Sequence, residues 1–199
     1  MKENLKRHLY YSWFIYLLVG FVVVAMANFF VNQKVKIKGY EKVSIFVGTP
    51  YANETKLEKD LLNNHIDSLL EVDILHYNES DTYFGLFLQT AGSNSDILII
   101  NGSDLSYETV LSYAYCLDTI DLSFVPEGAT YYEYDNKKYG IVIKDDDINY
   151  FKDYINYWPN NVYYLFINKE SKNFDSIFMP NKRHHSDNAT YILKKLFTL

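Results

Sequence analysis

A long uncharged run near the N-terminus constrains this chain more than any other feature. The nineteen residues from Trp13 to Val31 include no charged side chain and one strongly polar side chain, that of Asn28. A helix of this length covers about 28 Å, close to the hydrocarbon thickness of a bilayer. Aromatic residues that favour the headgroup level gather at one end, at Tyr10, Tyr11, Trp13 and Tyr16. The sequence predicts a transmembrane anchor over residues 10–31, preceded by a cytoplasmic tail over residues 1–9.

The orientation of this anchor does not follow from counting charges. Lys2, Lys6 and Arg7 precede the run, and four lysines follow it within residues 34–42. A basic N-terminus before an apolar run is typical of an export signal, which predicts a single-pass protein of the cell membrane with an extracellular C-terminal domain. Ala25-Met26-Ala27 also fits a signal-peptide cleavage site, which leaves a removed signal peptide as the alternative. The run continues past that site to Val31, which favours the uncleaved anchor.

The charge of the rest of the chain excludes one class of partner. The net charge is −6, and residues 1–42 carry seven basic and two acidic side chains, which leaves −11 for the remainder. An acidic domain lacks the basic face that binds a phosphate backbone, so we expect no nucleic-acid partner. Cys116 is the single cysteine, so the chain forms no intramolecular disulfide.

The pattern after a linker over residues 32–41 predicts alternating strands and helices. Apolar, β-branched and aromatic runs predict strands at residues 43–47, 70–77 and 96–100. Capping residues followed by helical spacing predict helices that begin near Thr55, Ser80 and Ser106. The continuously apolar third strand suggests burial on both faces. The sequence predicts a single α/β domain over residues 42–199, with a mostly parallel sheet flanked by helices.

The second half of the domain has a different texture. Tyr131–Tyr134 and Tyr139–Ile143 flank a polar tetrapeptide, which predicts a β-hairpin. Apolar spacing predicts a helix over residues 147–157, a strand over residues 162–167 and an amphipathic terminal helix over residues 188–199.

The order of these segments resembles the first lobe of bacterial extracellular solute-binding proteins, the ligand-capturing subunits of ABC importers. The stretches that carry the resemblance are Val43–Thr49, Ser95–Gly102, Tyr113–Asp121, Tyr134–Ile141 and Tyr163–Glu170. The resemblance implies a periplasmic-binding-protein-like lobe that contacts its ligand through loops at the carboxyl ends of strands, which agrees with the general rule for open α/β sheets. The chain departs from the family in a truncated second lobe and in an apolar run where the lipid-modified cysteine would stand.

Two loops and two aromatic residues form the predicted ligand site. The loops follow the first and third strands, and the aromatic rings could stack on a sugar or a peptide. The alternative is that the loop residues serve turn geometry and the rings pack in the core or at its rim. The predicted ligand-binding residues are Thr49, Tyr51, Asn101, Ser103, Asp104, Tyr139 and Trp158.

The sequence predicts neither a metal site, a cofactor nor an enzyme. Asp145–Asp147 and His184–Asp187 are the clusters of metal-ligating residue types, and neither has a recognised ligand spacing. The chain contains no nucleophile elbow, phosphate-binding glycine loop or HExxH motif.

We therefore expect a membrane-anchored extracellular binding module that is accessory to an ABC transporter and binds a small solute or a transporter subunit. The alternative is an interaction protein that uses the same lobe to bind a membrane protein without a small ligand.

Overall fold

The computed structural model describes residues 12–26, 37–63, 68–174 and 186–199. The chain divides into two compact units, Met1–Ile37 and Lys38–Leu199. In the first unit, residues 12–26 are helical. No helix within the described ranges is both long and apolar enough to cross a membrane. The predicted transmembrane helix is thus not supported, and its positions 10–11 and 27–31 lie outside the described residues, as do the predicted tail and linker residues 32–36.

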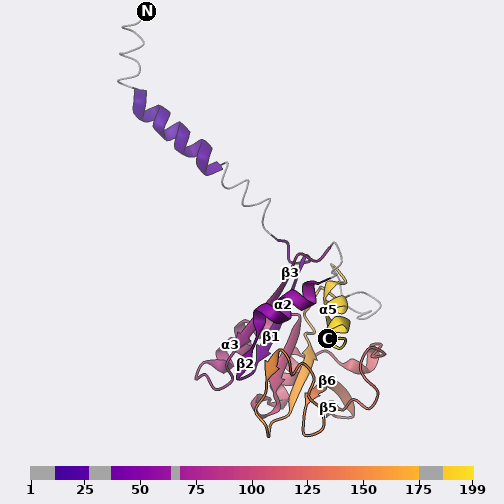
Figure 1. Ribbon diagram of the computed structural model, residues 1–199. Helices are drawn as coiled ribbons and strands as arrows, with labels where there is room; N and C mark the ends of the chain where they lie inside the picture. Colours follow the sequence, from indigo (N-terminus) through magenta and orange to yellow (C-terminus); the bar gives the residue numbers. More distant parts are fainter. Residues whose placement is uncertain (1–11, 27–36, 64–67, 175–185) are drawn as a thin grey trace, which may run out of the picture. The chain divides into compact units, whose positions relative to one another are not determined.

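The second unit is built on a mixed sheet of six strands (Figure 1). The strand order is β3-β1-β4-β8-β6-β5. These strands are β3 Glu71–Tyr77, β1 Lys42–Gly48, β4 Ile97–Asn101, β8 Tyr163–Ile167, β6 Lys137–Lys144 and β5 Tyr131–Tyr134. Strand β1 pairs in parallel with β3 and β4, whereas the other neighbours pair antiparallel. The predicted α/β class is confirmed, but the prediction of a mostly parallel sheet is wrong for the second half of the domain.

Helices cover both faces of the parallel half. Helices α2, Glu54–Leu62, and α5, Asn188–Leu196, pack on one face, where they lie side by side in Figure 1. Helices α3, Phe84–Thr90, and α4, Tyr107–Tyr113, supply Phe84 and Val110 to the other face. Alternate residues of β1 therefore enter different layers, and all five residues of β4 are buried. The predicted burial of β4 on both faces is confirmed.

Capping side chains set where the helices begin. The Asn53 side chain accepts a hydrogen bond from the Lys56 backbone N–H at 3.2 Å, so the cap of α2 lies two residues before the predicted Thr55 cap. Ser106 caps α4 as predicted and accepts from the Thr109 N–H at 3.2 Å. Ser80 does not cap a helix, because its hydroxyl donates to the Asn78 side chain at 2.6 Å and α3 begins four residues later.

The hairpin of the second half is confirmed, and the helix predicted over residues 147–157 is wrong. Asp135 and Asn136 have φ of 49° and 57°, as a two-residue turn of the mirror-image type requires between β5 and β6. Phe151 has φ of 60°, which no α-helix accommodates. Strand β7, Ile155–Asn156, pairs antiparallel with β2, Tyr51–Ala52. Long-range pairing and burial of the apolar side chains therefore override the local helical spacing.

Candidate functional site

The carboxyl ends of the parallel strands create the site. Because β1, β3 and β4 run in the same direction, their following loops meet at one sheet edge. Strands β3 and β4 lie on opposite sides of β1, which is the arrangement that opens a crevice in α/β sheets. A cavity of about 200 Å³, here called the carboxyl-edge pocket, lies at this edge. Its lining residues are Glu79, Ser80, Asn101, Ser103, Asp104, Trp158 and Asn161.

The end of β4 and the loop before β8 bring four predicted site residues into this pocket. The Asn101 side chain accepts a hydrogen bond from the Ser103 N–H at 3.1 Å, which folds Gly102–Asp104 into a short 3-10 turn. The Gly102 N–H donates to the Val162 carbonyl at 2.7 Å and draws the loop before β8 against this turn. A Cβ at Gly102 would lie 2.8 Å from the Tyr164 ring, so this close approach requires glycine. The structure thereby brings together Asn101, Ser103, Asp104 and Trp158.

Glu79 is the pocket residue with the most distinctive chemistry, and the sequence does not single it out. The fully buried Tyr163 donates its hydroxyl to Glu79 Oε1 at 2.6 Å, and the Trp158 N–H donates to that hydroxyl oxygen at 3.3 Å. The second carboxylate oxygen, Oε2, is buried and has no hydrogen-bond partner within the described part of the chain. A glutamate in a polar turn usually projects into solvent, so the sequence gives no reason to expect Glu79 in a binding site. Its partial burial becomes evident only from the contact with Tyr163.

The pocket has an acidic character. Burial raises the pKa of Glu79, the nearby Asp104 charge raises this pKa further, and the Tyr163 and Asn101 side chains oppose the rise. The Asn101 amide nevertheless makes no hydrogen bond to Oε2 with acceptable geometry. Burial also raises the pKa of Asp104, although this residue lies on the exposed rim, where solvent screens the effect. No basic side chain lines the described pocket.

The other three predicted site residues lie outside this pocket. Thr49 is fully buried, and its hydroxyl donates to the Tyr51 carbonyl at 3.3 Å. Tyr51 is 52% exposed on β2, whose pairing with β7 carries it away from the pocket lining. Tyr139 belongs to β6 and packs against the apolar layer of α3 and α4. The loop after β1 therefore serves local structure, because its threonine faces the interior.

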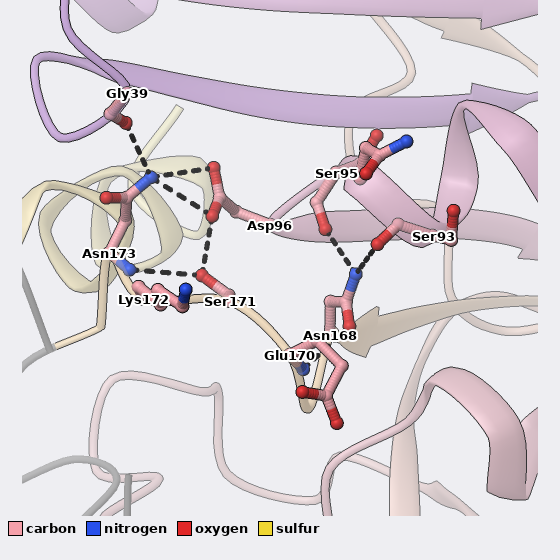
Figure 2. Close-up of a pocket in the computed structure, with 10 residues that line it drawn as sticks. Gly39, Ser93, Ser95, Asp96, Asn168, Glu170, Ser171, Lys172 and Asn173 are labelled. Atoms are coloured by element: carbon pink, nitrogen blue, oxygen red, sulfur yellow. Dashed lines mark hydrogen bonds between the residues drawn. The ribbon is translucent and has the colours of Figure 1, made fainter. Parts of the chain in front are cut away.

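A larger cavity of about 380 Å³ lies at the opposite edge of the sheet (Figure 2). Asp96, which precedes β4, is buried there and accepts hydrogen bonds on both carboxylate oxygens. The Ser44 N–H donates to Oδ2 at 2.9 Å, the Ser171 hydroxyl to Oδ1 at 2.5 Å, and the Asn173 amide to both oxygens at 3.2 and 3.3 Å. These contacts join the chain after β8 to β1 and β4. We call Asp96, Asn168, Ser171 and Asn173 the amino-edge network.

Asn168 completes the amino-edge network. Its side-chain amide donates to the Ser95 carbonyl at 2.6 Å and to the Ser93 carbonyl at 3.0 Å, as Figure 2 shows. Burial raises the pKa of Asp96, whereas its three donors oppose that rise. The buried side chains of this network hold the chain after β8 against β1 and the residues before β4, which is a structural role.

Metal-ligating residues do not converge within the described ranges. No group of three or more His, Cys, Asp or Glu side chains there is placed to hold a metal ion, and His184 and His185 lie outside those ranges. Asp145 instead shapes a turn, since its side chain accepts from the N–H groups of Asp147 and Ile148 at 2.9 and 2.7 Å.

Comparisons of the chain with known protein families, with curated proteins and with solved structures find no significant match.

Proposed function

We propose that this protein is a membrane-tethered, extracellular binding module that captures a small polar ligand in the carboxyl-edge pocket. One observation carries the proposal: residues from the ends of β3 and β4 and from the loop before β8 line a single cavity at the strand edge where open α/β sheets bind ligands. The resemblance to the first lobe of solute-binding proteins points to the same edge. This resemblance suggests that the protein acts together with an ABC transporter.

The size and lining of the pocket suit a polar ligand. Its volume of about 200 Å³ is below the 300–1,000 Å³ typical of sites for drug-sized molecules, which favours a ligand of about the size of an amino acid or a monosaccharide. Carboxylate, amide and hydroxyl groups supply hydrogen bonds, and Trp158, which is 46% exposed, supplies an aromatic face. Such a mixture of an aromatic surface with a few polar groups is the usual composition of a specific binding site.

The N-terminal run supports attachment to the membrane. Residues 12–26 are helical, and the uncharged sequence continues to Val31. We expect the full chain to remain with the membrane fraction after an alkaline carbonate wash, and protease added to intact cells to digest Lys38–Leu199. Release of the intact chain by carbonate would contradict the anchor, and protection of that unit in intact cells would contradict its extracellular position.

A thermal-shift screen of the full chain in mild detergent tests ligand capture. Sugars, amino acids and short peptides are the compounds to screen, and a ligand at 100 times its dissociation constant adds about 2.7 kcal/mol of stability. The shift should be lost in Trp158→Ala and reduced in Ser103→Ala. Tyr51→Ala is the matched control, because Tyr51 is similarly exposed but lies outside the pocket.

The outcomes of this screen separate the two functions that the sequence left open. A shift that survives Trp158→Ala but disappears in Tyr51→Ala would move the site away from the carboxyl-edge pocket. A folded chain that responds to no compound would contradict small-ligand binding and favour a membrane protein as the partner.

A further inference from the structure

We infer that the ligand of the carboxyl-edge pocket carries an ammonium group, which binds between Glu79, Asp104 and the ring of Trp158. This inference rests on the function proposed above and specifies the chemical class of the ligand.

The first support is the incomplete hydrogen bonding of Glu79. Its Oε1 is held by the Tyr163 hydroxyl at 2.6 Å, so the orientation of the carboxylate is fixed by a fully buried side chain. Its Oε2 is buried without a partner in the described structure. A buried acceptor that has lost water and gained no donor is destabilising, and more so when it is charged. A ligand that donates a hydrogen bond to Oε2 removes this cost.

The second support is the uncompensated negative charge. Among the described residues, Lys42 forms ion pairs with Glu71 and Asp73, and the His76 ring lies 3.5 Å from Glu54, so no ion pair involves Glu79 or Asp104. The two pocket carboxylates lie near enough for the charge of Asp104 to raise the pKa of Glu79. Since like charges disfavour each other and an opposite charge favours both, a cation is the partner that these groups lack.

The third support is Trp158, which separates an organic cation from the other candidates. An exposed indole face attracts a cation that lies within about 6 Å of its ring, and a neutral sugar lacks this attraction. A calcium ion takes six to eight oxygen ligands and gains nothing from an indole ring. An ammonium group has three donors, which suits two carboxylates and a neighbouring amide or hydroxyl. We therefore favour an amine over a sugar or a metal ion.

Matched pairs of probes test the inference by titration calorimetry on the full chain in mild detergent at pH 7. The pairs are D-glucosamine with D-glucose and putrescine with 1,4-butanediol, and calcium chloride is the hard-cation probe. We expect the amine of at least one pair to bind ten times more tightly than its neutral partner. Glu79→Gln should weaken amine binding at least tenfold, and the rim variant Asp104→Asn should weaken it less.

One control excludes attraction to the acidic domain in general, and a second pocket variant guards against loss of folding. Glu133→Gln removes one exposed carboxylate on β5, outside the pocket, and should leave amine affinity unchanged. Asp104→Asn alters an exposed residue, so it tests the inference even if Glu79→Gln fails to fold.

The outcomes distinguish this inference from the function on which it rests. Equal affinity for both members of each pair, or binding of calcium without the amines, overturns the ammonium group but leaves ligand capture intact. If another compound from the thermal-shift screen binds the pocket, a neutral or anionic hit overturns the inference and a cationic hit that needs Glu79 supports it. Silence from every probe and every screened compound overturns both proposals together.

Discussion

The two edges of the sheet both contain a buried acid, but they use it differently. At the amino edge, Asp96 accepts hydrogen bonds on both oxygens from Ser44, Ser171 and Asn173. At the carboxyl edge, Glu79 has one oxygen bonded to Tyr163 and a second, buried oxygen without a partner in the described residues. Burial raises the pKa of both acids. Burial of an acid therefore does not by itself mark a binding site, and the unused hydrogen-bonding capacity of Glu79 is what distinguishes the carboxyl edge.

The largest effect should come from removing the acid of the amino-edge network. Asp96→Ala leaves the Ser44 N–H and the Ser171 hydroxyl without this acceptor, whereas the Asn173 amide keeps the Gly39 and Lys42 carbonyls, and we expect the free energy of unfolding to fall by about 3 kcal/mol. Urea denaturation followed by circular dichroism measures this loss. Glu133→Ala, which removes an exposed acid, should change stability by less than about 0.5 kcal/mol. A loss below about 1 kcal/mol in Asp96→Ala would contradict the structural role of Asp96 and with it the contrast between the two edges.

An intermediate effect should follow the loss of the Tyr163 hydroxyl. Tyr163→Phe removes the donor to Glu79 and the acceptor of the Trp158 N–H, so we expect a loss of about 2 kcal/mol at pH 7. The loss should be smaller at pH 4, where a protonated Glu79 no longer depends on a charge-assisted hydrogen bond. Chemical denaturation at the two pH values measures both quantities. An equal loss at both would show that the hydroxyl stabilises the fold without acting on the Glu79 charge.

The smallest effect should come from Glu79→Gln, and its sign should depend on pH. The folded pKa of Glu79 is raised above its ordinary value of about 4.3, so between these two values the folded chain retains a proton that the unfolded chain releases. The contribution of Glu79 to stability is thus present below pH 4.3 and declines as pH rises through that window. Glu79→Gln escapes this decline, so its stability relative to the original chain should increase between pH 4 and pH 7, by less than about 1 kcal/mol.

Paired denaturation curves of the original chain and Glu79→Gln across this pH range measure the difference, because the other acids contribute equally to both. A relative stability that decreases toward pH 7 would mean that ionised Glu79 is already compensated, which would remove the main contrast with Asp96.

Local sequence was sufficient for the strands of the parallel half and for the start of α4, but not for the start of α3. The apolar runs of β1, β3 and β4 and the Ser106 cap lie within two residues of their predicted positions. The helix predicted over residues 147–157 failed because Phe151 adopts a left-handed backbone and β7 pairs with β2, a partner about one hundred residues earlier in the chain. The antiparallel insertion of β8 beside β4 likewise depends on long-range pairing, which no local spacing encodes.

The candidate site was predictable where a loop follows a strand and not where tertiary packing creates the chemistry. Asn101, Ser103 and Asp104 were predictable because they follow the end of a buried strand, and all three line the pocket. Glu79 gave no signal, because its role depends on the Tyr163 hydroxyl, which lies 84 positions away in the sequence. Thr49 has the same strand-end position as the turn after β4, but the backbone turns its side chain into the interior.

Strand β8 has a consequence for how the protein is made. Among the described strands it is the last to be synthesised, yet it lies between β4 and β6 in the middle of the sheet. While a ribosome or an export channel has released only the residues before Tyr163, the β3-β1-β4 unit and the β5-β6 hairpin each present an unpaired apolar edge. Such edges invite pairing with other chains, so we expect the nascent protein to depend on shielding until β8 emerges and joins the two halves.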